Sequence, residues 1–95
     1  MNWRQAQNID LGALAPAEAS AIKVFGSEYF IEGYRILMEV LRESGALKKG
    51  SAGTILDGRI ERYYRALLIL TFGGGTNEVQ RDIIAMAGLY MPRSR

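Results

Sequence analysis

Apolar residues between Pro16 and about Arg42 recur at steps of three and four, which is the spacing of one helix face. Pro16 suits the first turn of this predicted helix, because a helix start has no partner for the N–H that proline lacks. Ser44-Gly45 is predicted to end the helix, with Gly45 as the left-handed residue after the last turn. The main apolar face contains Ile22, Phe25, Tyr29, Gly33, Ile36 and Val40.

The apolar arc of this helix is unusually broad, covering roughly two-thirds of the circumference at about 100° per residue. A helix that packs against a single core needs a narrower stripe, so we expect burial on two sides. Gly26 and Gly33, seven residues apart in the same helix, lower its intrinsic stability. Close approach of a neighbouring helix is the favoured explanation, and two merely tolerated glycines are the alternative.

Two further helices are predicted. Asp57 is expected to cap a helix from about residue 58 to residue 72, and Thr76 to cap another from about residue 77 to residue 87. Gly88 is expected to stop the last helix. Residues 1–15 show only weak periodicity and are interpreted as an arm or a short helix. The chain is therefore predicted to be an all-α helical bundle with three main helices, divided into an N-terminal arm (residues 1–15) and a helical domain (residues 16–95).

Composition narrows the possible functions. The chain has 95 residues, 48% hydrophobic and 23% charged, which favours one small folded domain. The net charge of +2 is too small, and the basic residues too scattered, to indicate nucleic-acid binding. Cysteine and histidine are absent, so neither a disulfide framework nor a metal site is expected. No apolar run approaches the roughly 18 residues that cross a bilayer, and no signal peptide is evident. These features favour a cytoplasmic protein without a membrane role.

The run Gly73-Gly74-Gly75 before Thr76 is the most informative motif. Glycines permit positive φ and close approach to the backbone, and the helix behind them begins with free N–H groups and a positive dipole end. This combination suits an anionic or polar cofactor edge, although a flexible hinge explains the glycines equally well. The dinucleotide fingerprint is excluded, because Glu78 stands at its third glycine position.

The sequence from Gly75 to Arg81 resembles the C-terminal motif of the FAD-dependent acyl-CoA dehydrogenases; it reads Gly-Thr-Asn-Glu-Val-Gln-Arg. The segment 17–23 looks like the start of that family's first C-terminal helix, and Tyr64-Arg65 falls where the next helix carries an arginine. The tail 88–92 is similar to the family's ending. Thr71-Phe72-Gly73-Gly74-Gly75 is most similar to the heteromeric members that act on steroid side chains.

The resemblance implies α,β-dehydrogenation of an acyl-CoA thioester. A carboxylate would remove the α-proton, the β-hydrogen would pass as hydride to FAD, and an electron-transferring flavoprotein would reoxidise the flavin. Within this family Thr76, Asn77 and Glu78 would lie against FAD, and Gly75 would lie next to the acyl-CoA substrate. A homo- or hetero-oligomer is also implied.

Two departures from the family's pattern qualify this expectation. Many members carry the catalytic glutamate where this chain has Gly74, so no catalytic residue is predicted here. Some members place the base on an earlier helix, and some heteromeric enzymes have one subunit type without it. The family's Gln-x-x-Gly-Gly segment is not reproduced between Glu39 and Leu47. We therefore expect part of a larger enzyme that contributes flavin contacts and oligomer packing and is inactive alone. The alternative is a non-enzymatic helical assembly module or a non-catalytic subunit that retains the family's packing surface.

Overall fold

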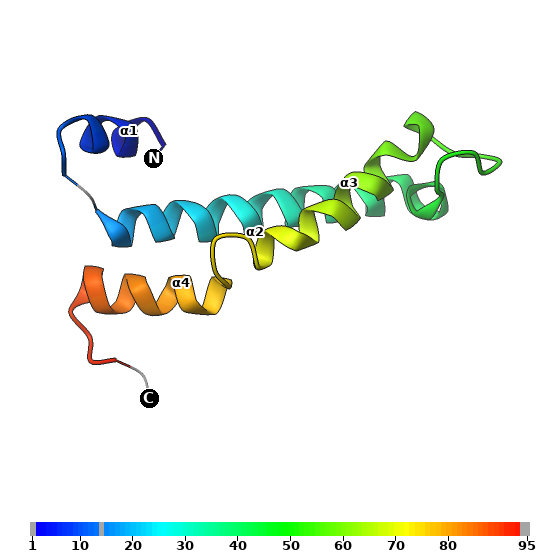
Figure 1. Cartoon of the computed structure of the whole chain (residues 1–95). Helices are drawn as coiled ribbons and strands as arrows, with labels where there is room; N and C mark the ends of the chain where they lie inside the picture. Colours follow the sequence, from blue (N-terminus) through cyan, green and yellow to red (C-terminus); the bar gives the residue numbers. More distant parts are fainter. Residues whose placement is uncertain (1, 14, 94–95) are drawn as a thin grey trace. The chain divides into compact units, whose positions relative to one another are not determined.

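The computed structural model describes residues 2–13 and 15–93, and every regular element in these residues is helical (Figure 1). Met1 and Leu14, which belong to the predicted arm, lie outside the described residues. The all-α prediction is confirmed. The α-helices are α1 (Asn2–Asp10), α2 (Pro16–Leu41), α3 (Arg59–Leu67) and α4 (Asn77–Ile83). Short 3-10 helices are η1 (Arg42–Ala46), η2 (Leu56–Gly58) and η3 (Leu68–Thr71), and a π-helical turn, η4 (Ile84–Gly88), extends α4.

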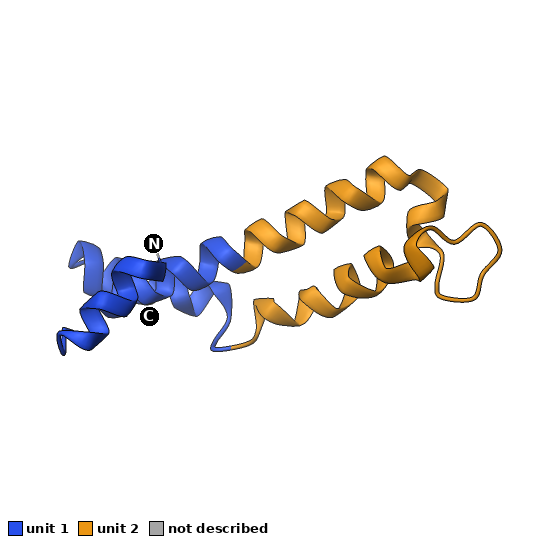
Figure 2. Ribbon diagram, turned by 90° about the horizontal axis from the view of Figure 1, so that it is seen from above, with its two compact units in different colours: residues 1–26, 74–95 blue, residues 27–73 orange. Residues whose placement is uncertain are grey.

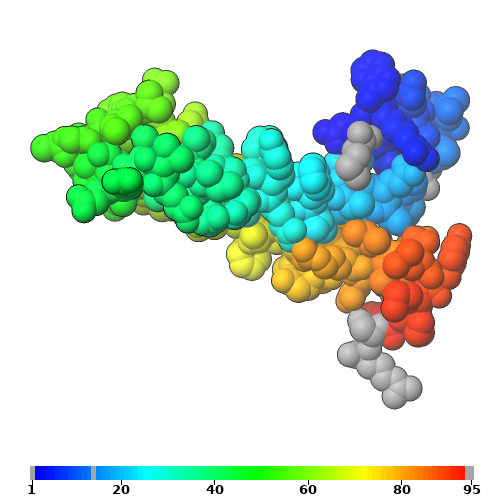
Figure 3. Space-filling view, turned by 180° about the vertical axis from the view of Figure 1, so that it is seen from behind, coloured from blue at the N-terminus to red at the C-terminus, as the bar shows by residue number. Residues whose placement is uncertain are grey.

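Two compact units make up the chain (Figure 2). Unit 1 contains residues 1–26 and 74–95, and in it the first turns of α2 lie between α1 and α4 (Figure 3). Glu18 joins α1 to α2, because its carboxylate pairs with Arg4 at 3.4 Å and accepts a hydrogen bond from Asn8 Nδ2 at 3.3 Å. The predicted arm is thus helical over most of its length, while its boundary at residue 15 stays a prediction.

Unit 2 contains residues 27–73, where the second part of α2 and α3 run in opposite directions (Figure 2). The rings of Tyr34 and Tyr63 meet between these two helices, with centroids 5.9 Å apart and planes inclined by 53°. Such an inclined aromatic contact contributes beyond the apolar area that it buries. The pair therefore fixes α3 against α2.

The end of α2 differs from the prediction. Arg42, with φ of 52°, is the left-handed residue after Leu41, and Gly45 does not have a positive φ. Gly45 is buried in η1, and a Cβ placed on it would lie 2.7 Å from the carbonyl oxygen of Met38. Glycine is therefore required at position 45 for close approach to the last turns of α2, not for its conformational freedom.

The start of α3 also differs from the prediction. Asp57 does not cap the helix, because it lies inside η2 with φ of 56° and pairs with the Lys49 ammonium at 3.1 Å. Gly58 occupies the cap position in a left-handed conformation, with no side-chain capping bond. A Cβ on Gly58 would lie 2.6 Å from the backbone nitrogen of Lys49, so the path of the loop selects glycine there.

Most of the broad apolar arc of α2 is exposed. Val24, 9% exposed, is the buried apolar side chain of the described residues, whereas Phe25 and Val40 are 61% and 72% exposed. A Cβ on Gly26 or Gly33 would meet no described atom within 4 Å. The expected burial on two sides and the expected close helix approach are therefore not supplied by the described part of this chain. The large exposed apolar residues of α2 are Phe25, Tyr29, Phe30, Ile36, Leu37 and Val40.

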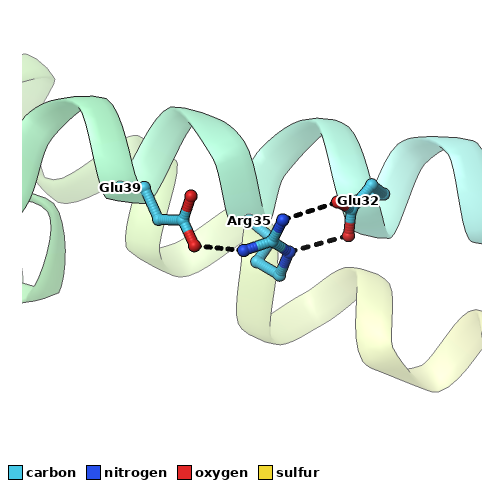
Figure 4. A network of polar contacts seen from close by, with 3 residues as sticks. All are labelled: Glu32, Arg35 and Glu39. Atoms are coloured by element: carbon cyan, nitrogen blue, oxygen red, sulfur yellow. Dashed lines mark hydrogen bonds and ion pairs between the residues drawn. The ribbon is translucent and has the colours of Figure 1, made fainter.

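One exposed side of α2 carries an ionic network (Figure 4). Arg35 donates hydrogen bonds to both carboxylate oxygens of Glu32, at 2.7 and 2.6 Å, and also pairs with Glu39 one turn further on. The hydrogen bonds from Arg35 lower the pKa of the Glu32 carboxyl below its ordinary value, and the same contacts raise the pKa of Arg35. The network supports α2 along the side where its polar residues gather.

The lowered pKa of Glu32 predicts a pH dependence of the helix. A carboxyl whose pKa falls on folding stabilises the folded state above its unfolded pKa, and this contribution disappears as the pH falls through the lowered value. Helicity, followed by circular dichroism during acid titration, should therefore fall in that interval, and less steeply for Arg35→Gln. Identical acid titration curves for the two proteins would contradict this assignment.

Two glycines of α2 and η1 should respond to alanine in opposite directions. Gly33→Ala should raise the free energy of unfolding by about 1 kcal/mol, because alanine favours a helix and no described atom obstructs its methyl group. Gly45→Ala should lower it by about 1–3 kcal/mol, because the methyl group would collide with a backbone carbonyl. Urea unfolding of both variants measures the difference. A loss of stability in Gly33→Ala would mean that other atoms do cover that position.

Candidate functional site

The turn that leads into α4 depends on two left-handed glycines. Gly74 has φ of 73° and Gly75 has φ of 101°. The left-handed backbone conformation costs a residue with a Cβ roughly 1–2 kcal/mol, so glycine is favoured at both positions. A Cβ on Gly75 would also lie 2.9 Å from Nε2 of Gln80, whereas one on Gly74 would meet no described atom within 4 Å. Both positions therefore favour glycine because of their φ, and at position 75 a Cβ would also displace the Gln80 amide.

Thr76 begins α4 as predicted. Its backbone is extended, with φ of −63° and ψ of 156°, and its Oγ1 accepts a hydrogen bond from the Val79 N–H at 3.3 Å. The Gln80 N–H donates to the Thr76 carbonyl at 3.0 Å, which closes the first helical turn. An N-cap of this kind satisfies one N–H of the first turn, and the others have no acceptor within the helix itself.

Two side chains hold the carbonyl groups of the turn. Gln80 Nε2 donates to the Gly74 oxygen at 2.7 Å. Lys23, on α2, donates from Nζ to the Gly75 oxygen at 2.8 Å and to Asn77 Oδ1 at 2.5 Å. Gln80 and Asn77 are 9% and 6% exposed. The turn is thus held on one side by a buried amide from its own helix and by an ammonium group from another helix.

The predicted site residues lie together in this turn but differ in exposure. Glu78 is exposed, and Thr76 and Gly75 are partly buried. Asn77 is buried, and its amide oxygen accepts from Lys23, so this side chain holds the turn from within. Their proposed contacts with FAD and substrate stay predictions. Gly74, where the resemblance implies a catalytic glutamate in many members, has no group that takes up a proton.

Sequence reasoning missed the role of Lys23. The sequence places Lys23 only within the family-like segment 17–23. A weak signal is that its helix neighbours Ser20, Val24 and Ser27 are small or apolar, and the structure buries all three. A lysine in such a row needs an acceptor, but the sequence does not show that the acceptor is the carbonyl of a residue 52 positions later.

Metal groups, membrane spans and cavities are the other kinds of site to consider in the described part of the chain. It contains no group of three or more acidic side chains that could hold a metal ion. Among the described helices, none is long and apolar enough to cross a membrane. A cavity of about 150 Å³ lies beside α1 and α2 and involves none of the turn residues. It is lined by Arg4, Glu18, Ala21 and Ile22.

The cap at Thr76 provides a direct test of the local geometry. Thr76→Ala should lower the free energy of unfolding by about 1 kcal/mol, because the Val79 N–H loses its acceptor. Thr76→Ser keeps the oxygen and serves as the matched control. Urea unfolding, monitored by circular dichroism, measures both. Equal losses in the two variants would show that the methyl group, not the cap, carries the effect.

Comparison with known proteins places this chain in a family. The family model "Acyl-CoA dehydrogenase, C-terminal domain" matches residues 1–89. The chain is 55% identical over 98 residues to the acyl-CoA dehydrogenase FadE26 of Mycobacterium tuberculosis, covering 99% of this chain and 24% of that protein. The match therefore spans about a quarter of the relative's length.

Solved structures give the same result. The ChsE4-ChsE5 complex from Mycobacterium tuberculosis contains a chain that is 56% identical and superimposes with a TM-score of 0.86, covering 98% of this chain and 24% of that one. The Tcur3481-Tcur3483 steroid acyl-CoA dehydrogenase matches with 41% identity and a TM-score of 0.88 over the same shares. The chain belongs to the acyl-CoA dehydrogenase family and corresponds to its C-terminal helical domain.

Proposed function

We propose that this chain contributes the C-terminal helical region of an FAD-dependent enzyme that dehydrogenates acyl-CoA thioesters, with the turn from Gly74 to Glu78 against the flavin. The geometry of the turn carries the proposal. A Cβ on Gly74 would meet no described atom within 4 Å, both glycines have a positive φ, and Thr76 caps the helix that follows. A flat, polar ring system fits such a turn, because two successive residues without side chains let it approach the backbone closely.

Each residue of the turn has a separate part in this proposal. Gly75 would allow the acyl thioester to approach the backbone, and the Thr76 cap would keep the start of α4 in place. Glu78, exposed in the first turn, would contact the flavin from the helix N-terminus. The chemistry that FAD supplies when bound is acceptance of a hydride from the β-carbon of the acyl group. An electron-transferring flavoprotein would be the oxidant of the reduced cofactor.

The α-proton needs an acceptor, and Gly74, which stands where many members of the family carry the catalytic glutamate, has no side chain to supply one. We propose that the base comes from another element or subunit. Two solved relatives, ChsE4-ChsE5 and Tcur3481-Tcur3483, are each named as two components, which supports a hetero-oligomer.

The exposed arc of α2 supports a place in a larger assembly. Six large apolar side chains of α2 are exposed, and covering a side chain of this size stabilises by about 1.5–3 kcal/mol. Gly26 and Gly33 lie on the same helix with free space above them, so another helix could approach there closely. This same arc favours the second candidate, an assembly module of the family that packs without binding flavin.

The decisive measurement is made on the native protein, purified together with whatever it assembles with. We expect a yellow protein that reduces an artificial electron acceptor when given an acyl-CoA, while the separate 95-residue chain shows no turnover. A colourless assembly would favour the assembly module. Turnover by the separate chain would contradict the placement of the base elsewhere.

Glycine variants test whether the flavin binds at the turn. Gly75→Val should abolish flavin binding, because valine is strained at this φ and would displace the Gln80 amide that holds the turn. Gly53→Val is the matched control, because Gly53 also has a positive φ, of 81°, but lies in the loop before α3. Retained flavin in Gly75→Val would remove the turn from the cofactor site.

A further inference from the structure

Two successive carbonyl groups of the glycine turn are each held by a side chain. The Gly74 oxygen accepts from Gln80 Nε2 at 2.7 Å, and the Gly75 oxygen accepts from Lys23 Nζ at 2.8 Å. Free glycines would let these peptide groups rotate, because glycine has the widest choice of φ and ψ. The two hydrogen bonds remove that choice at the point where the chain enters α4.

The direction of the carbonyls determines the direction of the neighbouring N–H groups. In a trans peptide the C=O and N–H bonds of one plane point in opposite directions, and the described chain contains no cis peptide. The N–H of Gly75 shares a plane with the Gly74 oxygen, and the N–H of Thr76 shares one with the Gly75 oxygen. Both N–H groups therefore point away from Gln80 and Lys23.

Lys23 adds rigidity and charge to this arrangement. Its ammonium group bridges the Gly75 oxygen and Asn77 Oδ1, at 2.8 and 2.5 Å, so one cation holds both the turn and the first residue of α4. Hydrogen bonds from a charged donor are roughly twice as strong as neutral ones. Asn77 and Gln80 are buried, and the three hydrogen bonds are partly buried.

We infer that Lys23 and Gln80 form a carbonyl clamp, which fixes the glycine turn so that the N–H groups of Gly75 and Thr76 face the open side of the turn. Lys23 is thus a positioning residue for the cofactor, acting through the backbone from another helix. The identity of the ligand as FAD rests on the proposed function. The clamp itself rests on the hydrogen bonds alone.

Amide hydrogen exchange tests the clamp without any flavin. In the native protein, Lys23→Met keeps the aliphatic stem but removes the donor, so exchange in the segment 75–79 should rise roughly tenfold, the factor expected for one charged hydrogen bond. Lys23→Arg keeps the charge and N–H donors and should recover part of the protection. Lys48→Met, which alters an exposed lysine outside the turn, should change nothing there.

Gln80→Met provides an independent variant should Lys23→Met fail to fold. It removes the amide that holds the Gly74 oxygen while keeping a side chain of similar length, and it should raise exchange in the same segment. Unchanged exchange in both Lys23→Met and Gln80→Met would overturn the clamp.

Flavin affinity then tests the positioning role. The dissociation constant of FAD should rise roughly tenfold in Lys23→Met, with partial recovery in Lys23→Arg and no change in Lys48→Met. Raised exchange with unchanged FAD affinity would overturn the positioning role. If the unaltered native protein contains no flavin, the proposed function fails, and exchange alone decides whether the clamp exists.

Discussion

The ammonium group of Lys23 joins two parts of unit 1 that are more than fifty residues apart in the chain. Its bonds to the Gly75 carbonyl and the Asn77 amide place the start of α4 relative to the first turns of α2. A partly buried ammonium group is costly unless it has acceptors, and here a backbone carbonyl and a buried amide offset that cost. Thr76 and Gln80 then complete the turn with bonds from α4 itself. The geometry on which the proposed cofactor contacts rest therefore depends on one long-range polar contact as much as on the glycines.

Polar contacts carry so much of the structure because the described chain has little core of its own. Val24 is buried, while much of the apolar surface of α2 faces outward. Specific contacts between elements include Glu18 to α1, Tyr34 to Tyr63, and Lys23 to the turn. An exposed apolar arc of this size favours further packing. The same helix, α2, therefore supplies both Lys23, which holds the glycine turn, and the exposed apolar arc.

The local features of the chain were predictable, and the loop geometry was not. Helix α2 and the Thr76 cap follow from periodicity and from the preference for hydroxyl side chains at a helix start, both of which act between near neighbours. The end of α2 and the start of α3 were predicted wrongly. The left-handed residue after α2 is Arg42, where Gly45 was predicted. The residue that caps α3 is the left-handed Gly58, where a side-chain cap from Asp57 was predicted. A Cβ on Gly45 would collide with the Met38 carbonyl and one on Gly58 with the Lys49 nitrogen, so the path of the whole loop selects glycine at both positions.

By itself, the sequence determined the helical class of the protein, its family and the place of the glycine turn, because periodicity, capping and a short motif are written in consecutive residues. Only the tertiary structure decided which side chains hold the turn. Asn77, one of the residues that the resemblance places against FAD, is buried and accepts a hydrogen bond from Lys23. Lys23 itself carried no local mark of this role. A hydrogen bond between residues 52 positions apart depends on how two helices come together, and that arrangement leaves no periodic signal in either segment.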